Sequence, residues 1–305
     1  MTGRLRLLFE PYTSGAMKIA PYASCAKARS PLPLFVGPQN RHGSVASAMS
    51  TLIVCVVALI ASGLTFFSGF GLGTLLLPAF ALFYPIEIAV ALTAVVHFLN
   101  GLFKLWLVGR HANLRVVLLF GVPALAASFV GAWVLLWLSE FKPLVSYTLL
   151  GREVLVAPAK LVVGVLLLLF STAELVPRFR SLSFPSKYLP LGGVLSGFFG
   201  GLAGMQGALR SAFLAKSGLS KEQFVATGAV VAFMIDISRL SVYVPAFLAA
   251  RAALDYPILA AAVLAALIGS VVGNRYLKSV TMKGIQSTVA IMLFAVALGL
   301  ISGVL

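Results

Sequence analysis

The sequence predicts an all-α membrane protein that crosses the bilayer several times. The chain of 305 residues is 60% hydrophobic and only 10% charged, whereas soluble domains carry about 25% charged residues. Its mean hydropathy is +1.04. The apolar runs are long and continuous and do not alternate with polar residues, so helices are favoured over a β-barrel.

Residues 1–48 differ from the rest of the chain. They are basic, contain several prolines and serines, and lack an apolar stretch followed by a small-residue cleavage site. We expect a disordered tail, or residues upstream of a true start at Met49. An Arg-rich, acid-poor organelle-targeting peptide is the alternative.

Eight long and two short apolar segments follow, which gives about 8–10 helices. The long segments are residues 50–70, 86–108, 113–138, 154–175, 188–204, 222–249, 255–275 and 284–304. The short segments, 72–85 and 206–218, fall below the about 20 residues that a full span needs. We expect them to be half-helices, tilted pieces or re-entrant segments.

The two halves of the chain resemble each other. YPIEIAVALTAVVHFLNGLFKL at 84–105 aligns without a gap with LSKEQFVATGAVVAFMIDISRL at 219–240, and ASFVGAWVL at 127–135 matches GSVVGNRYL at 269–277. The order of these matches predicts two transmembrane repeats, residues 49–175 and 176–305.

The relative orientation of the repeats depends on the short segments. If these segments cross the bilayer, each repeat crosses five times and the repeats are inverted; if not, the repeats are parallel. With ten crossings, most basic residues fall on one side, which the positive-inside rule makes cytoplasmic. That side holds Lys104, Arg110, Arg115, Arg178, Arg180, Lys187, Lys216, Lys221, Arg275, Lys278 and Lys283. The other side holds Arg41, Lys142, Arg152, Arg239 and Arg251. This distribution favours inverted repeats with both termini outside.

Glycine-rich stretches interrupt the apolar sequence once in each half. They read SGFGLGTLLLP at 68–78 and SGFFGGLAGMQG at 196–207. A helix broken in the membrane leaves unpaired N–H groups at its new N-terminus, and these groups favour an anion. Glycine permits the close backbone approach that such a site needs. The glycines expected at the substrate site are Gly69, Gly71, Gly73, Gly197, Gly200 and Gly201.

Arg210 lies in the second short segment, directly after these glycines. Charged side chains within the membrane are costly, so they usually face the protein interior and serve function. The guanidinium group holds an oxyanion with two hydrogen bonds, and Gln206 offers a neutral donor beside it. The alternative is that Arg210 extends to the membrane surface from a short helix.

Two further polar groups lie in the matched long segments. Asp236 and Arg239 share a helix face and can pair. We expect Arg239 to supply positive potential, while Asp236 orients it or carries a coupling proton; a structural ion pair or an interfacial anchor is the alternative. His97, Asn100 and Lys104 also share one face. We expect these residues to couple ion movement to transport, with His97 carrying a proton; a hydrogen-bonded core histidine is the alternative.

Other candidate residues have structural interpretations. Glu87 and Glu222 open matched helices and suit the helix dipole, while Gly131 and Gly273 allow close helix packing. The sequence holds no P-loop, no HExxH, no GxSxG and no cysteine or histidine cluster. We therefore expect no catalysis, no cofactor and no metal. The net charge of +15 reflects the tail and the membrane-flanking links, so we expect no nucleic-acid partner.

The two glycine-rich breaks, with EIAVALTAVV at 87–96 and FVATGAVVA in the second half, resemble the sulfite exporter TauE/SafE family of membrane permeases. The resemblance covers roughly residues 50–305. It implies transport of sulfite, sulfonates, thiosulfate or other small organosulfur or carboxylate anions across the cytoplasmic membrane. In the second half GMQGALRSAF replaces an apolar stretch with glycine and proline that is common in the family, so Arg210 marks a departure from it.

We therefore expect a multi-pass secondary transporter of a small anion, surrounded by lipid in the cell membrane. An anion channel, or a non-transporting subunit of a membrane complex, are the alternatives. The sequence identifies neither the anion, the direction of transport, the coupling ion nor the oligomeric state.

Overall fold

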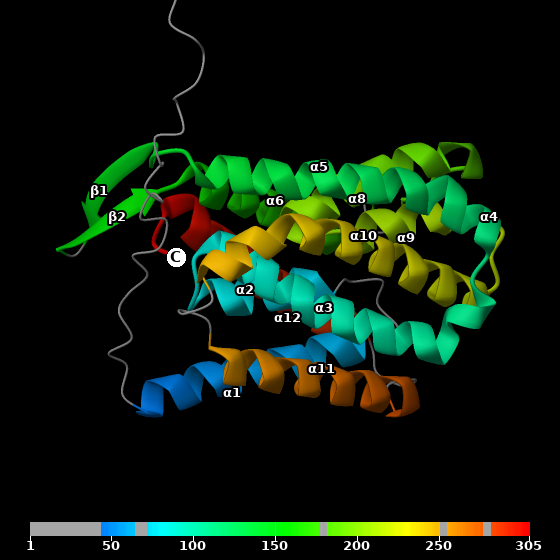
Figure 1. Cartoon of the computed structure of the whole chain (residues 1–305), viewed down its shortest axis with the longest axis horizontal. Coiled ribbons are helices and arrows are strands. Elements are labelled where there is room, and N and C mark those ends of the chain that lie inside the picture. Colours follow the sequence, from blue (N-terminus) through cyan, green and yellow to red (C-terminus); the bar gives the residue numbers. More distant parts are fainter. Residues whose placement is uncertain are drawn as a thin grey trace, which may run out of the picture. The chain divides into compact units, whose positions relative to one another are not determined.

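The computed structural model of the chain describes residues 44–64, 72–149, 151–176, 178, 182–250, 255–276 and 282–305. The longer helices are α1 (Ser44–Leu64), α2 (Leu72–Ala81), α3 (Ile86–Val108), α5 (Val122–Ser139), α6 (Pro158–Leu175), α8 (Leu189–Ala203), α9 (Gly207–Leu214), α10 (Lys221–Ala250), α11 (Tyr256–Tyr276) and α12 (Met282–Ser302). Short helical turns are η1 (Gly109–His111), α4 (Leu114–Val116), η2 (Val117–Gly121) and η3 (Ser186–Tyr188). Figure 1 shows the arrangement.

The fold confirms the predicted class of helical membrane protein. Within the described residues, four helical stretches are long and apolar enough to cross a membrane: 86–111, 114–139, 221–248 and 256–273. Large apolar side chains cover the outer surface; Trp106 is 80% exposed and Leu264 is 60% exposed. Such a surface suits contact with lipid and would be unfavourable in water. The described helices lie in the expected segments.

A β-hairpin, β1 (Val145–Leu149) and β2 (Arg152–Val156), was not predicted from the sequence. The strands are antiparallel and place Tyr147 opposite Val154. The Tyr147 hydroxyl donates to the Ser302 carbonyl oxygen at 2.6 Å, which joins the hairpin to the end of α12. The strands are five residues each. Residues 154–156 of β2 belong to the predicted apolar segment 154–175, because an apolar run alone does not distinguish the end of a strand from the start of a helix.

The second helix break lies later than Gly197. Helix α8 runs without interruption through Gly197 and ends at Gly204, whose φ of 73° is left-handed. Its N–H donates to the Gly200 carbonyl oxygen at 2.9 Å, the usual way in which glycine ends a helix. Helix α9 then begins at Gly207. Glycine permits a left-handed backbone without requiring it, and Gly197 keeps the helical conformation.

The first break was predicted at Gly69 and Gly71, which lie outside the described residues. Helix α2 follows it, and all ten of its residues are buried. Its Gly73 lies directly against Gly204, because a Cβ atom on Gly73 would come 2.7 Å from the Gly204 carbonyl oxygen. The first turn of α2 therefore packs on the break between α8 and α9.

Helices from the two predicted repeats interleave within one compact unit, Gly37–Leu305. Helix α5 packs on α8, α1 on α11, α6 on α12 and α3 on α10. Phe98 and Phe233, which the alignment makes equivalent, stack with ring centroids 5.0 Å apart. These are the contacts that two-fold related halves would make, and they support the duplication, which itself stays a prediction.

Glycines bring the interleaved helices into backbone contact. Three glycines lie on one face of α8, and a Cβ atom added to any of them would collide with a backbone carbonyl oxygen of η2 or α5. The pairs are Gly193 with Phe120, Gly197 with Ala124 and Gly201 with Ser128. Gly269 and Gly273 of α11 contact Leu59 and Gly63 of α1 in the same way. Small residues four positions apart drive helix association in membranes by allowing this approach.

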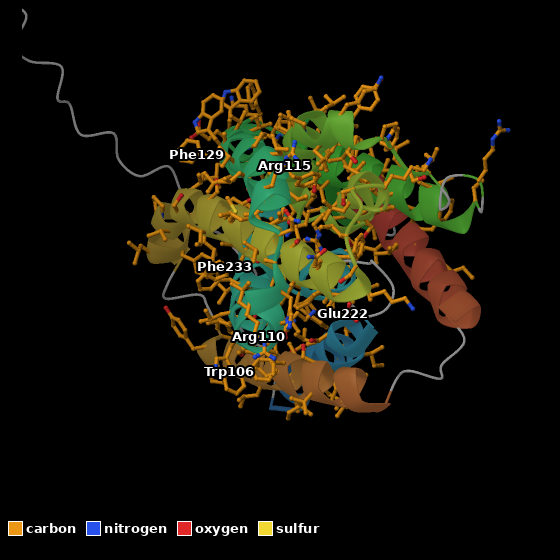
Figure 2. All side chains as sticks on the ribbon, turned by 90° about the vertical axis from the view of Figure 1, so that its right-hand side faces the viewer. Trp106, Arg110, Arg115, Phe129, Glu222 and Phe233 are labelled. Atoms are coloured by element: carbon orange, nitrogen blue, oxygen red, sulfur yellow. The ribbon has the colours of Figure 1, made fainter. Side chains whose placement is uncertain are left out.

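Basic links gather at one end of the helices. The Asn113 N–H donates to Thr227 Oγ1 at 3.0 Å, and Ser186 Oγ donates to the Lys216 carbonyl oxygen at 2.8 Å. Exposed basic residues at this end are Arg110, Arg115, Lys187, Lys216 and Lys221. Figure 2 faces this end, with Arg110, Arg115 and Glu222 labelled. The β-hairpin and the C-terminus lie at the opposite end (Figure 1).

Substitution of Gly197 tests the contact between α5 and α8. Gly197→Ala places a methyl group against the Ala124 backbone, so we expect destabilisation of about 1–3 kcal/mol from overpacking. Gly109→Ala is the matched control, because its Cβ atom would meet only the Leu105 side chain at 3.6 Å. Thermal unfolding in detergent should lower Tm for Gly197→Ala alone; equal Tm values for the two variants would contradict the packing argument.

Candidate functional site

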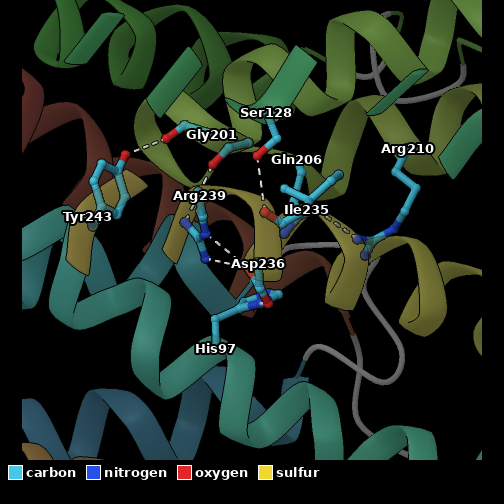
Figure 3. A network of polar contacts seen from close by, with 10 residues as sticks. His97, Ser128, Gly201, Gln206, Arg210, Ile235, Asp236, Arg239 and Tyr243 are labelled. Carbon is cyan, nitrogen blue, oxygen red and sulfur yellow. Dashed lines mark hydrogen bonds and ion pairs between the residues drawn. The ribbon is translucent and has the colours of Figure 1, made fainter. Parts of the chain in front are cut away.

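A buried carboxylate lies at the centre of the candidate site. Asp236 of α10 is fully buried and accepts hydrogen bonds on both oxygens (Figure 3). Arg239 Nε lies 2.9 Å and Arg239 Nη2 2.7 Å from Oδ1. His97 Nδ1 of α3 lies 2.5 Å from Oδ2. The predicted ion pair of Asp236 with Arg239 is present, and His97 joins it from the equivalent helix of the other predicted repeat.

The Arg239 guanidinium group lies against the break between α8 and α9. Its Nη1 atom donates to the Gly200 carbonyl oxygen at 3.4 Å, and a Cβ atom on Gly204 would come 3.0 Å from Nη1. Apart from the ion pair with Asp236, Nη2 has no hydrogen-bond acceptor among the described residues. Arg239 therefore directs part of its donor capacity toward the unwound backbone.

Neighbouring hydrogen bonds fix α10 against α5 and α8. The Tyr243 hydroxyl donates to the Gly201 carbonyl oxygen at 2.5 Å, and Ser128 Oγ donates to the Ile235 carbonyl oxygen at 3.1 Å. Tyr243 was not among the predicted residues, although it lies one helical turn after Arg239 and therefore on the same face.

Gln206 and Arg210 form a second polar group at the start of α9. Gln206 is fully buried, and its Oε1 atom accepts from Arg210 Nη1 at 3.5 Å. Gln206 Nε2 has no hydrogen-bond partner in the described part of the chain. Since a buried donor without a partner costs about 1–3 kcal/mol, this atom favours a ligand that accepts a hydrogen bond.

Arg210 is half-buried and points inward beside Gly228, where a Cβ atom would lie 3.5 Å from Nε. No carboxylate of a described residue lies within ion-pair distance of it. Figure 3 shows the Arg210 guanidinium group directed toward Gln206, to which a dashed line joins it.

Lys104 adds positive charge to the same region. Its side chain is half-buried at the end of α3 and interacts electrostatically with Arg210 and His97. Asp236 acts on Arg210, Arg239 and His97. Asp236 is thus the carboxylate that two arginines, Arg210 and Arg239, share. The excess of positive charge suits a bound anion.

Asn100 takes part in a separate network, although it shares a helix face with His97. Its Oδ1 atom accepts from Ser270 Oγ at 2.6 Å and from Ser62 Oγ at 3.2 Å. The two hydroxyl groups lie 2.6 Å apart, so this buried cluster joins α1, α3 and α11. Nothing in the sequence pattern pointed to Ser62.

The predicted glycines fall in different places. Gly200 lies between Arg239 and Gln206, and Gly73 lies against the break. Gly197 and Gly201 pack on α5, and Gly201 also accepts the hydrogen bond from Tyr243. Glu87 and Glu222 lie in the first turns of α3 and α10, as expected. No group of three metal-ligating side chains occurs among the described residues.

The sequence matches one known protein family. A family model described as Sulfite exporter TauE/SafE matches residues 54–300, from within α1 to within α12. No curated protein and no solved structure matches the chain. Because the match covers most of the sequence and nearly all described helices, the chain belongs to the sulfite exporter TauE/SafE family, a family of membrane transporters.

Proposed function

We propose that the protein is a secondary transporter of a small oxyanion, such as sulfite, a sulfonate or a related organosulfur or carboxylate anion. The observation that carries the proposal is Arg210, an inward-pointing guanidinium group with no carboxylate partner among the described residues. The unpartnered Gln206 Nε2 and the excess positive charge around Asp236 support the same ligand class.

The substrate is proposed to bind where α9 begins. The N–H groups in the first turn of a helix have no acceptor within that helix, and they carry the positive end of the helix dipole. Arg210 lies in the first turn of α9. Together these donors match the several oxygen atoms of a sulfite or sulfonate group, while Arg239 adds positive potential from behind the break.

The two interleaved halves support alternating access. Helices α2 and α9 are short and begin beside or after a break, while long helices surround them. In transporters with this organisation, one half moves against the other around a site near the middle of the membrane. Counterflow of labelled anion, with saturation at low concentration, separates this carrier from an anion channel.

The basic end of the molecule is proposed to face the cytoplasm. Arg110, Arg115, Lys187, Lys216 and Lys221 are exposed there, and an excess of lysine and arginine in short links marks the cytoplasmic side. This orientation places the β-hairpin on the side of the cell membrane opposite the cytoplasm.

A panel of anions tests the proposed substrate class. We expect sulfite, thiosulfate, methanesulfonate or acetate to raise the Tm of the purified protein, whereas the cation choline should not. A ligand at about 100 times its Kd stabilises the folded state by about 2.7 kcal/mol. Uptake of the stabilising anion into proteoliposomes is the second measurement. Failure of every anion to bind or to cross would overturn the proposal.

Neutralising Arg210 tests the binding residue. Arg210→Gln removes the charge and retains a polar side chain, so we expect anion affinity to fall about 10- to 100-fold, because hydrogen bonds to charged groups contribute about 1.5–3 kcal/mol. Arg115→Gln, at an exposed position, should bind as the wild type does. Unchanged affinity and flux in Arg210→Gln, with normal folding, would remove Arg210 from the site.

Cysteine labelling tests the orientation. In a background with Cys25→Ser and Cys55→Ser, an impermeant maleimide added to intact cells should label Thr148→Cys in β1 but not Lys187→Cys in η3. Both positions are exposed, so both should react after the cells are lysed. Labelling of the cysteine at position 187 alone in intact cells would reverse the orientation.

A further inference from the structure

Asp236, Arg239 and His97 form one buried network, and their contacts determine which atoms carry protons. Arginine is always charged in proteins, and both Arg239 contacts fall on Asp236 Oδ1, so the carboxylate is ionised. The 2.5 Å contact between His97 Nδ1 and Asp236 Oδ2 then requires a proton on Nδ1. In the neutral imidazole, the Nε2 atom therefore carries the lone pair and is the site where a proton binds.

Of the three side chains, only His97 has exposed surface. Its side chain is 10% exposed, whereas those of Asp236 and Arg239 are 0% exposed. Of these three side chains, His97 is therefore the most accessible to a proton donor.

The charge of the network depends on that proton. With neutral His97, the charges of Asp236 and Arg239 cancel; with protonated His97, the network carries a net charge of about one positive unit. The charged groups that act on the imidazole are Asp236 and Arg239 of α10 and Lys104 of α3 itself. Helices α2 and α5, and residues 256–273 of α11, contain no charged side chain.

We infer that anion binding at Arg210 is coupled to protonation of His97 at Nε2, so that the anion and one proton cross the membrane together. This inference rests on the proposed function and names its coupling ion. Asp236 connects the two events, because it contacts His97 directly and also interacts electrostatically with Arg210. The proton enters from the aqueous phase to which the site is open and leaves to the opposite phase with the anion.

The sign of the coupling follows from charge. A positive imidazolium favours a nearby anion, and by linkage the bound anion favours the protonated imidazole by the same factor. Anion affinity therefore rises as the pH falls through the titration of His97. One linked proton limits the change to about tenfold per pH unit.

The test uses thiosulfate and methanesulfonate, whose charges stay constant between about pH 5 and about pH 8, the range in which histidines usually titrate. Proteoliposomes containing the full chain and an internal pH indicator receive an inward gradient of either anion. We expect acidification of the lumen with the wild-type protein. Affinity measured by thermal shift should increase toward low pH.

His97→Gln is the decisive variant, because the amide still donates to Asp236 but cannot carry the proton. We expect it to bind the anion with an affinity that no longer varies with pH, and to lose anion-driven acidification. His111→Gln is the matched control, since His111 is exposed in η1, and it should retain both properties.

Two results would overturn the inference while leaving the proposed function intact. One is anion flux through the wild-type protein without acidification. The other is a His97→Gln variant that keeps the wild-type pH dependence. If the variant does not fold, the wild-type flux alone decides. If neither anion binds to or crosses with the wild-type protein, and the wider panel also fails, the proposed function falls and this inference falls with it.

Discussion

The buried charge of Asp236 constrains the centre of this membrane protein. A carboxylate removed from water costs several kcal/mol unless it is paired and hydrogen-bonded. Asp236 meets that requirement with Arg239 on one oxygen and His97 on the other. Because His97 belongs to α3 and the other two residues to α10, the requirement fixes these central helices together. Because Arg239 also reaches Gly200, it links the ion pair to the break that precedes α9.

Close helix packing makes this polar centre tolerable in a lipid environment. Irregular backbone occurs at membrane depth only where protein or a hydrated cavity surrounds it. Glycines of α8 and α11 bring their backbones against α5 and α1, and α2 is buried along its whole length. The apolar side chains excluded from these contacts face outward. The same chain thus combines an apolar exterior that suits lipid with a buried centre that holds charged side chains.

Much of the site was predictable because its residues are unusual where they occur. Charged side chains are rare within apolar segments, and this made Arg210, Asp236, Arg239 and Lys104 candidates. The spacing of Asp236 and Arg239 predicted their pairing. The shared face of His97 and Asn100 was less informative. A face of α3 is wide enough to meet α10 on one side and α1 with α11 on the other, so the two residues joined different networks.

The glycine-rich stretch predicted a break but not its position, because several glycines there permit a left-handed residue and only the packing of α8 on α5 selects Gly204.

Hydropathy, segment length and the order of motifs in the sequence were sufficient to predict the membrane class, most helical segments and the family. These properties depend on residues close together in the chain, where burial in lipid requires about 20 apolar residues and internally paired backbone. The contact of His97 with Asp236 joins residues 139 positions apart, and the pairing of α5 with α8 and of α1 with α11 joins the two halves. Such contacts depend on how whole helices fit against one another, and local sequence patterns do not reveal which helices will pack together. The folded arrangement was therefore needed to show that one carboxylate connects a histidine, two arginines and a broken helix.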